Sequence, residues 1–141
     1  MSMSMSMPEA AMAFFDACET GKGWDVCQAW CHDGATFACQ AETLAEISTL
    51  KDYTEWMKGL LTPVPDLTYA IESFAIDAER NAVSVYGVVR GTQTGEGGPV
   101  PPTGKTAVAD YVYVMRFDGD KIRHMTKIWN DGHTLKQLGW A

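Results

Sequence analysis

The sequence predicts an α+β domain in which helices pack on one face of a bent antiparallel sheet. Apolar side chains recur every three or four residues before about residue 62, which is the helical period. After Asp66 they alternate with polar side chains, which is the period of a strand. Helices that come first and strands that come later are typical of the α+β class.

Glycine and proline residues mark the limits of the expected helices. Pro8 suits a first helical turn, and Gly21 and Gly23 are expected to end the first helix. Pro63 ends the third, because proline cannot continue a helix. The expected helices span residues 8–20, 24–31 and 50–61.

The strands are expected in pairs joined by turns. Residues 79–81 and 118–120 suit tight hairpin turns. Residues 91–105 are rich in Gly and Pro and favour a fixed, irregular loop at a rim or a subunit contact, not a phosphate-binding loop. The expected strands span residues 35–40, 67–77, 81–91, 105–117 and 121–130, and a short helix over 132–139 closes the chain.

The length and the net charge of the chain limit the number of domains and the classes of partner that it can bind. A chain of 141 residues suits one domain, expected over residues 8–141, after a disordered tail over residues 1–7. The net charge of −7 argues against nucleic acid and anionic membranes as partners. With no apolar run of spanning length and no signal-peptide pattern, a cytoplasmic location with reduced thiols is expected.

Three stretches carry a resemblance to a known family. They are GTQTGE at residues 91–96, PPTGK at 101–105 and QLG at 137–139. Together they resemble the SnoaL-like polyketide cyclase branch of the nuclear transport factor 2-like superfamily. The resemblance implies a cone-shaped, cystatin-like α+β roll, in which the N-terminal helices cover the bent sheet and a pocket lies between them.

The same resemblance implies a homodimer. The outer, convex face of the sheet is the expected contact, because an apolar sheet face must be covered. His124, Thr126 and Ile128 are expected near it.

A second resemblance, to ketosteroid isomerase of the same superfamily, marks positions in the pocket. It is carried by residues 114–118 and by the strand that ends at Trp129. The catalytic positions of that enzyme fall here on Phe14, Cys39 and Tyr113, so its machinery is absent. The resemblance implies that these positions still face the pocket, together with Trp129.

Strand alternation extends this wall. If Trp129 faces inward, Met125 and Lys127 lie on the same side of its strand. Such a hydrophobic pocket is expected to bind a small apolar or aromatic molecule. The expected ligand-binding residues are Phe14, Cys39, Met125, Trp129 and Asn130.

Three residues are candidates for catalysis, and the first is Asp131. SnoaL-like cyclases have a late aspartate that removes a proton next to a carbonyl group. The family pattern places it seven residues before the Gln of QLG, which is Asn130 here, so either residue could enter the pocket. Either could instead cap the helix over 132–139.

Lys127 and Tyr113 are the other two candidates. A lysine in a pocket can act as a base or form a Schiff base, although pairing with a carboxylate is equally compatible with the sequence. Tyr113 could donate a hydrogen bond to a substrate carbonyl, or it could be a core aromatic whose hydroxyl is bound by a neighbour.

The cysteines do not predict a metal site. Cys27, Cys31, His32 and Cys39 lack the spacing of paired zinc-binding cysteines, and buried thiols are the preferred interpretation. No metal and no organic cofactor are expected.

Two functions remain open from the sequence. One is a cofactor-independent cyclase, isomerase or hydrolase that acts on a small apolar carbonyl compound by general acid–base chemistry. The alternative is a non-catalytic ligand-binding or assembly domain of the same fold. A buried carboxylate with a raised pKa beside an apolar cavity would favour the enzyme, and Asp131 capping a helix in solvent would favour the binding domain.

Overall fold

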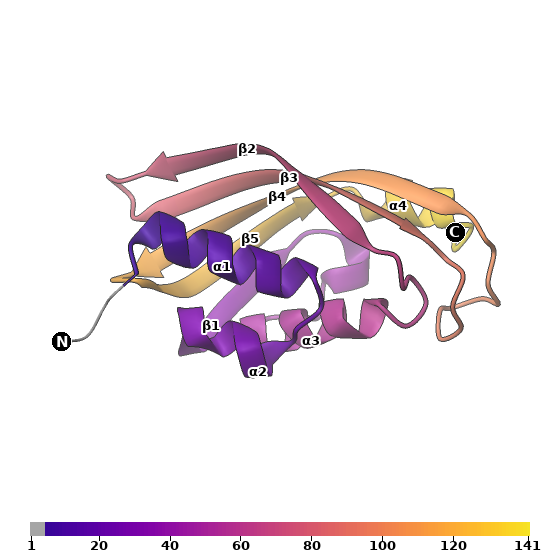
Figure 1. Ribbon diagram of the computed structural model, residues 1–141, viewed down its shortest axis with the longest axis horizontal. Helices are drawn as coiled ribbons and strands as arrows, with labels where there is room; N and C mark the ends of the chain where they lie inside the picture. The colour runs from indigo at the N-terminus through magenta and orange to yellow at the C-terminus, as the bar shows by residue number, and fades with distance from the viewer. Residues whose placement is uncertain (1–4) are drawn as a thin grey trace.

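The computed structural model describes residues 5–141, which form four α-helices, two 3₁₀ turns and one five-stranded sheet (Figure 1). The α+β class is therefore confirmed. The helices are α1 (Met7–Glu19), α2 (Trp24–Cys27), α3 (Leu50–Leu60) and α4 (Asp131–Leu138). The strands are β1 (Cys31–Cys39), β2 (Thr68–Asp77), β3 (Ala82–Thr92), β4 (Thr106–Asp118) and β5 (Lys121–Trp129), and the 3₁₀ turns are η1 (Gln28–Trp30) and η2 (Glu42–Leu44).

The sheet has the order β1-β5-β4-β3-β2, and it is mixed rather than antiparallel as expected. The pairs β2–β3, β3–β4 and β4–β5 are antiparallel, whereas β1 runs parallel to β5. A short connection forces antiparallel pairing, but most of the chain lies between β1 and β5. No hairpin therefore sets the direction of β1.

The hydrophobic core lies between the helices α1 and α3 and the concave face of the sheet, as Figure 1 shows for α1 beneath β2–β5. Side chains on this face alternate with those on the outer face, so every second residue of β4 is buried. α4 follows β5 and lies at the end of the sheet far from the N-terminus. The largest fully buried side chains include Phe14, Phe15, Tyr53, Tyr113, Met115 and Met125.

The first helix begins one residue earlier than expected. The Ser6 hydroxyl accepts a hydrogen bond from the backbone N–H of Glu9, and the Glu9 carboxylate accepts one from the Ser6 N–H. This capping box places Met7 in the helix. Ser6 and Met7 are therefore held in the cap and first turn of the helix, contrary to the disordered tail expected over residues 1–7, and residues 1–4 of that tail lie outside the described residues.

The second helix is shorter than the helix predicted over residues 24–31. α2 ends at Cys27, and Cys31 begins β1, where it pairs with Ile122 of β5. The four-residue spacing of Cys27 and Cys31 suits a helical stripe, but it also suits a short helix followed by a strand. Val26 of α2 is 43% exposed, so it does not belong to the buried side of this helix.

The loop between β3 and β4 is held in a fixed path by its own polar groups. The Gln93 side chain donates to the Gly95 carbonyl over 3.0 Å and accepts from the Thr103 N–H over 2.6 Å. The Thr103 hydroxyl donates to the Leu138 carbonyl of α4 over 2.6 Å. A side chain at Gly95 would place its Cβ 2.0 Å from the Thr62 carbonyl oxygen, so the close approach there requires glycine.

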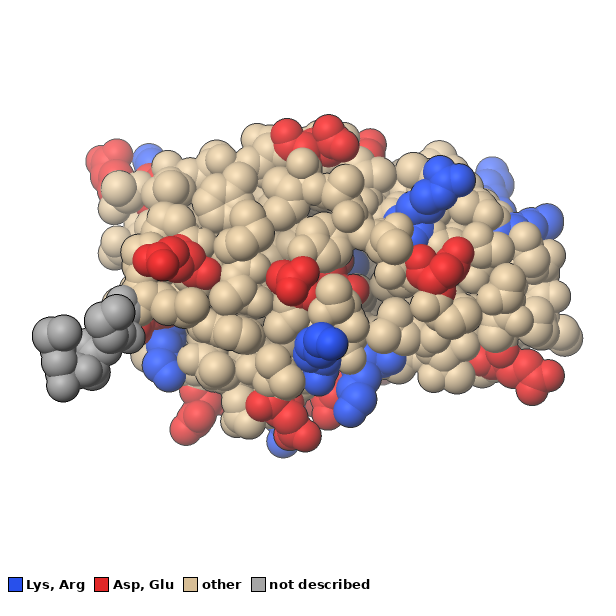
Figure 2. Space-filling view, in the orientation of Figure 1, with Lys and Arg blue, Asp and Glu red and all other residues tan. Residues whose placement is uncertain are grey.

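Charged side chains are spread over the surface. On the face drawn in Figure 2, acidic side chains lie along the whole length of the molecule, with basic side chains between them. No helix within residues 5–141 is long and apolar enough to cross a membrane.

Candidate functional site

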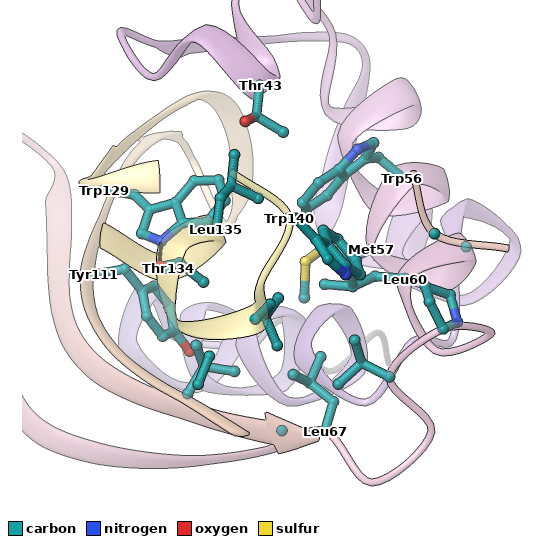
Figure 3. A pocket seen from close by; sticks show the side chains of 18 of the residues that line it. Thr43, Trp56, Met57, Leu60, Leu67, Tyr111, Trp129, Thr134, Leu135 and Trp140 are labelled. Atoms are coloured by element: carbon teal, nitrogen blue, oxygen red, sulfur yellow. Dashed lines mark hydrogen bonds between the residues drawn. The ribbon is translucent and has the colours of Figure 1, made fainter. Parts of the chain in front are cut away.

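A cavity of about 560 Å³ lies between α3, the concave face of β3–β5, and α4 with the residues that follow it (Figure 3). Three elements outside the sheet close it: the turn after α3, the loop between β3 and β4, and the chain after α4. Its volume suits a drug-sized organic molecule. The apolar lining includes Trp56, Met57, Leu60, Val64, Leu67, Val89, Trp129, Leu135, Leu138 and Trp140.

Aromatic rings form two facing walls of this cavity. Tyr111 and Trp129 come from the sheet, and Trp56 from α3 and Trp140 lie across the cavity from them (Figure 3). The indole N–H of Trp129 donates to the Thr134 hydroxyl of α4 over 2.8 Å, which fixes that ring. A flat apolar molecule could therefore lie between the two walls.

Two charged side chains, Glu19 and Lys127, are among the lining residues. Glu19 is the last residue of α1 and Lys127 lies near the end of β5, and they are only 3% and 6% exposed. Buried charges are costly unless hydrogen bonds and an opposite charge compensate them. The contacts of these two side chains therefore define the site.

Four side chains form a continuous hydrogen-bonded chain that joins the two charges. Lys127 Nζ donates to the Tyr53 hydroxyl over 2.9 Å, and the hydroxyls of Tyr53 and Tyr113 bind each other. Tyr113 in turn donates to Glu19 Oε1, while Tyr111 donates to Glu19 Oε2 over 2.7 Å. We call Glu19, Tyr113, Tyr53 and Lys127 the buried relay.

The donor and the acceptor of each hydrogen bond in the buried relay follow from counting protons. Each tyrosine hydroxyl has one proton to donate. When Glu19 is ionised, Tyr113 uses its one hydroxyl proton in the hydrogen bond to Glu19. Tyr113 must then accept a hydrogen bond from Tyr53, and Tyr53 accepts one from Lys127. A shift of three protons along this chain converts the ammonium–carboxylate pair into an amine and a carboxylic acid without any change in net charge.

Burial and the neighbouring groups shift the pKa values of Glu19 and Lys127 in opposite directions. Burial raises the pKa of Glu19, and the positive charge of Lys127 and the hydrogen bonds from Tyr111 and Tyr113 counteract it. Burial lowers the pKa of Lys127, and the negative charge of Glu19 counteracts that shift. The two sites titrate as a coupled pair.

Aromatic rings surround the Lys127 ammonium group. Its Nζ lies 4.3 Å from the ring centre of Trp129, 5.1 Å from that of Tyr53 and 5.7 Å from that of Trp56. Cation–π attraction favours the charged form of the lysine and opposes part of the effect of burial. A positive charge in an apolar cavity can stabilise an anion that forms beside it.

The structure brings together three of the residues proposed from the sequence. Lys127 and Trp129 line the cavity, and Tyr113 belongs to the buried relay. Phe14 and Met125 are fully buried in the core and are not among the lining residues. Cys39 is half-buried at the end of β1, also outside the lining.

Asn130 and Asp131 lie beside the cavity rather than in its lining. Asn130 caps α4, where its side chain accepts from the His133 N–H over 3.2 Å. The Asp131 carboxylate accepts from the N–H and the hydroxyl of Thr43 over 2.9 and 2.7 Å. These hydrogen bonds lower the pKa of Asp131, which makes it a weak proton acceptor at neutral pH.

The sequence interpretation missed Glu19 and Tyr53. Glu19 lies four residues after Phe15 on the apolar stripe of α1, and an acidic residue on such a stripe was a signal for a buried carboxylate. Tyr53 lies on the apolar side of α3, where nothing local distinguishes it from a core aromatic. Only the fold brings its hydroxyl to Lys127.

Three of the four thiols, those of Cys18, Cys27 and Cys31, are buried, as expected for Cys27 and Cys31. Burial raises the pKa of Cys27 and that of Cys31 to about 12, so both are neutral thiols at physiological pH. The Cys31 thiol lies 3.5 Å from the Cys27 carbonyl, and all four cysteines are free. Within residues 5–141 no three His, Cys, Asp or Glu side chains are grouped so as to hold a metal ion.

Comparison with protein families gives one match over most of the chain. A sequence model described as SnoaL-like polyketide cyclase matches residues 9–138. No curated protein matches the chain.

Solved structures share the whole fold at low sequence identity. AclR of Streptomyces galilaeus is 21% identical with a TM-score of 0.76, over 96% of this chain and 88% of its own. IdmH of Streptomyces antibioticus is 20% identical with a TM-score of 0.75, over 95% and 99%. A Catenulispora acidiphila protein with a ketosteroid isomerase-like fold, solved with trimethylamine, is 15% identical with a TM-score of 0.72, over 96% of each chain.

Proposed function

The chain belongs to the SnoaL-like polyketide cyclase family, and we propose that it is a cofactor-independent enzyme acting on a small apolar carbonyl compound by general acid–base chemistry. One observation carries the proposal: an apolar cavity is lined by a buried carboxylate with a raised pKa and by a buried lysine. Perturbed ionisable groups of this kind are typical of catalytic sites.

The proposed chemistry begins at Glu19. Its carboxylate takes a proton from the carbon next to the substrate carbonyl, and its raised pKa makes it a stronger base than an ordinary glutamate. The Lys127 ammonium stabilises the negative charge that develops on the carbonyl oxygen. The resulting enolate can attack a second carbonyl group and close a ring, and the new alkoxide then takes the proton held by Glu19. Where a neighbouring double bond extends the enolate to a dienolate, Glu19 can instead return its proton to the far carbon, which gives isomerisation.

Tyr113 has a positioning role in this proposal. Its hydroxyl and that of Tyr111 hold the two carboxylate oxygens of Glu19, so the carboxylate cannot rotate freely. Asp131 is less suited to be the base, because Thr43 binds its carboxylate and lowers its pKa.

The alternative is a non-catalytic ligand-binding domain of the same fold. One observation favours it: both oxygens of Glu19 already accept hydrogen bonds from tyrosines, as they would in a purely structural ion pair. In that case the cavity binds its ligand without exchanging protons with it.

Proton exchange with a model ketone separates these functions. The probe is 2-tetralone in deuterium oxide, and NMR follows the loss of the protons next to its carbonyl group. The wild type is expected to accelerate the exchange over buffer, and Glu19→Gln to lower the rate by about 10²–10⁴-fold. Glu46→Gln, which changes an exposed glutamate, is the matched control.

Two outcomes would contradict the proposal. If the wild type binds 2-tetralone but does not accelerate the exchange, the binding function stands instead. If Asp131→Asn abolishes the exchange while Glu19→Gln retains it, the base is Asp131 rather than Glu19.

We also propose that the protein is a cytoplasmic homodimer joined through the outer face of the sheet. On that face Ile128 is 60% exposed and pairs with Val112 of β4, next to Thr126 and Val114. An apolar strip of this kind on a sheet is a natural subunit contact. The four free thiols suit a reducing compartment.

A further inference from the structure

The amino group of Lys127 lies between the two aromatic walls of the cavity. Its Nζ is 4.3 Å from the ring centre of Trp129 and 5.5 Å from that of Tyr111, both on the sheet, and 5.7 Å from that of Trp56 on α3. All three rings and Lys127 itself line the cavity, and Figure 3 shows Trp56 across it from Tyr111 and Trp129. The nitrogen is therefore placed where a molecule held between the walls would meet it.

This amino group has few polar neighbours. Among residues 5–141, Nζ has one hydrogen-bond partner, the hydroxyl of Tyr53. An ammonium group has three N–H donors, so two of them lack an acceptor in this part of the chain. The carboxylate of Glu19 reaches the lysine through Tyr113 and Tyr53. A buried ammonium that has lost its water and gained one partner is destabilised relative to the neutral amine, and burial accordingly lowers the pKa of Lys127.

The buried relay provides a path by which Lys127 can lose its proton. The shift of three protons leaves Lys127 as an amine and Glu19 as a carboxylic acid, and the net charge of the buried groups does not change. An ammonium group has no lone pair, whereas a neutral amine in an apolar pocket is a nucleophile towards carbonyl carbon. The relay can thus convert Lys127 into its reactive form without a proton acceptor from solvent.

We propose that Lys127 forms an imine with an apolar aldehyde or ketone bound in the cavity. Nζ attacks the carbonyl carbon, so a C–N bond forms, the C–O bond later breaks, and the oxygen leaves as water with both protons of the amine. The Tyr53 hydroxyl, 2.9 Å from Nζ, is placed to take a proton from the nitrogen and give one to the departing oxygen. Glu19 then returns its proton through the relay to the imine nitrogen, which gives an iminium ion and a carboxylate.

The surroundings of Lys127 suit this product. The iminium ion carries the same single positive charge as the ammonium group that it replaces, so the attraction to Glu19 and to the aromatic rings is kept. The apolar lining limits the access of water, which would hydrolyse the imine. In the proposed function Lys127 acts only through its charge, so a covalent bond to the ligand goes beyond that function.

Reductive trapping tests the proposal on the wild-type protein. The probe is 2-naphthaldehyde with sodium cyanoborohydride, which reduces an iminium ion to a stable secondary amine, and peptide mass spectrometry locates the adduct. Lys51, an exposed lysine of α3, is the internal reference. At pH 7 an exposed lysine is almost entirely protonated, so we expect Lys127 to be labelled faster than Lys51 by about tenfold or more.

Two controls connect the adduct with the cavity. The hydrocarbon 2-methylnaphthalene has the same ring system without the carbonyl group, and it should slow the labelling of Lys127 but not that of Lys51. Lys127→Arg keeps a positive charge for Glu19 but cannot form the imine, so the adduct in the cavity should be lost. Lys51→Arg is the matched variant and should label at Lys127 at the wild-type rate.

Three results would overturn the proposal: the wild type gains no adduct at Lys127, Lys127 is labelled no faster than Lys51, or 2-methylnaphthalene does not protect it. The proposed function is judged separately, because 2-naphthaldehyde has no hydrogen on the carbon next to its carbonyl group and so offers Glu19 no proton to remove. Exchange in 2-tetralone without an adduct would remove only the covalent role of Lys127. An adduct without exchange would remove only the proton abstraction by Glu19.

Discussion

Tyr113 donates a hydrogen bond to the carboxylate of Glu19, and both side chains are buried. The contact joins the end of α1 to the middle of β4 and so ties a helix to the sheet. A carboxylate removed from water in this way is stabilised by its donors and by Lys127, and destabilised by its burial. The stability of the fold should therefore depend on its protonation.

The first prediction concerns pH. Because burial raises the pKa of Glu19 above its ordinary 4.5, the folded protein holds this proton at pH values where the unfolded chain has lost it. The contribution of Glu19 to the free energy of unfolding is therefore full below pH 4.5 and falls as the pH rises through the folded-state pKa. Urea unfolding between pH 4.5 and 8 should show this fall in the wild type and a weaker one in Glu19→Gln. Equal slopes would contradict it.

The second prediction concerns the middle of the buried relay. Tyr53→Phe removes the hydroxyl that accepts from Lys127 and binds Tyr113, so two buried partners lose a contact. We expect a loss of about 2–4 kcal/mol in the free energy of unfolding, measured with urea. Tyr86→Phe is the control: its hydroxyl binds Asp110 at the surface, and its loss should cost less than about 1 kcal/mol. Similar losses in both variants would mean that the relay contributes no more than a surface contact.

The third prediction concerns the loop between β3 and β4. Gly95→Ala would place a Cβ against the Thr62 carbonyl, so the loop must shift, and we expect a loss of about 1–3 kcal/mol. Gly59→Ala in α3 meets no atom within 4 Å and should instead stabilise the protein by about 0.5–1 kcal/mol. Thermal unfolding of the two variants should thus give shifts of opposite sign. A neutral Gly95→Ala would show that the loop is not packed against Thr62.

The fourth prediction concerns the proposed dimer. Ile128→Glu places a charge in the apolar strip on the outer face of the sheet and should convert a dimer into a monomer, as judged by light scattering after size exclusion. Ile76→Glu is the control. Ile76 is 53% exposed on β2 and pairs with the buried Val83, so it belongs to the inner face. A monomeric wild type, or a dimeric Ile128→Glu, would reject this contact.

Most helices and strands could be predicted because the spacing of their apolar residues can be read from neighbouring positions in the sequence. The alternation that begins near Leu67 fixes the strands to within one or two residues, and it also places Lys127 and Trp129 on the same face as Met125. The parallel pairing of β1 with β5 could not be predicted in this way. It depends on contacts between residues distant in the sequence, such as Phe37 and Met125.

The site was less predictable because its chemistry depends on tertiary contacts. The sequence left open whether Asn130 or Asp131 enters the pocket. The backbone decides this by making Asn130 the cap of α4 and by turning Asp131 towards Thr43. Glu19 and Tyr53 become part of the site only because α1 and α3 place them beside β4 and β5. The local period of apolar residues contains no information about such contacts between distant parts of the chain.

The loop between β3 and β4 and the residues after α4 close one side of the cavity without belonging to the sheet. Substitutions there, at Pro99 or Trp140 for example, can change which molecules fit while the buried relay keeps its geometry. Related proteins could thus diverge in substrate choice by altering these two segments alone. The same two segments are where an engineer would begin to change the ligand preference of this protein.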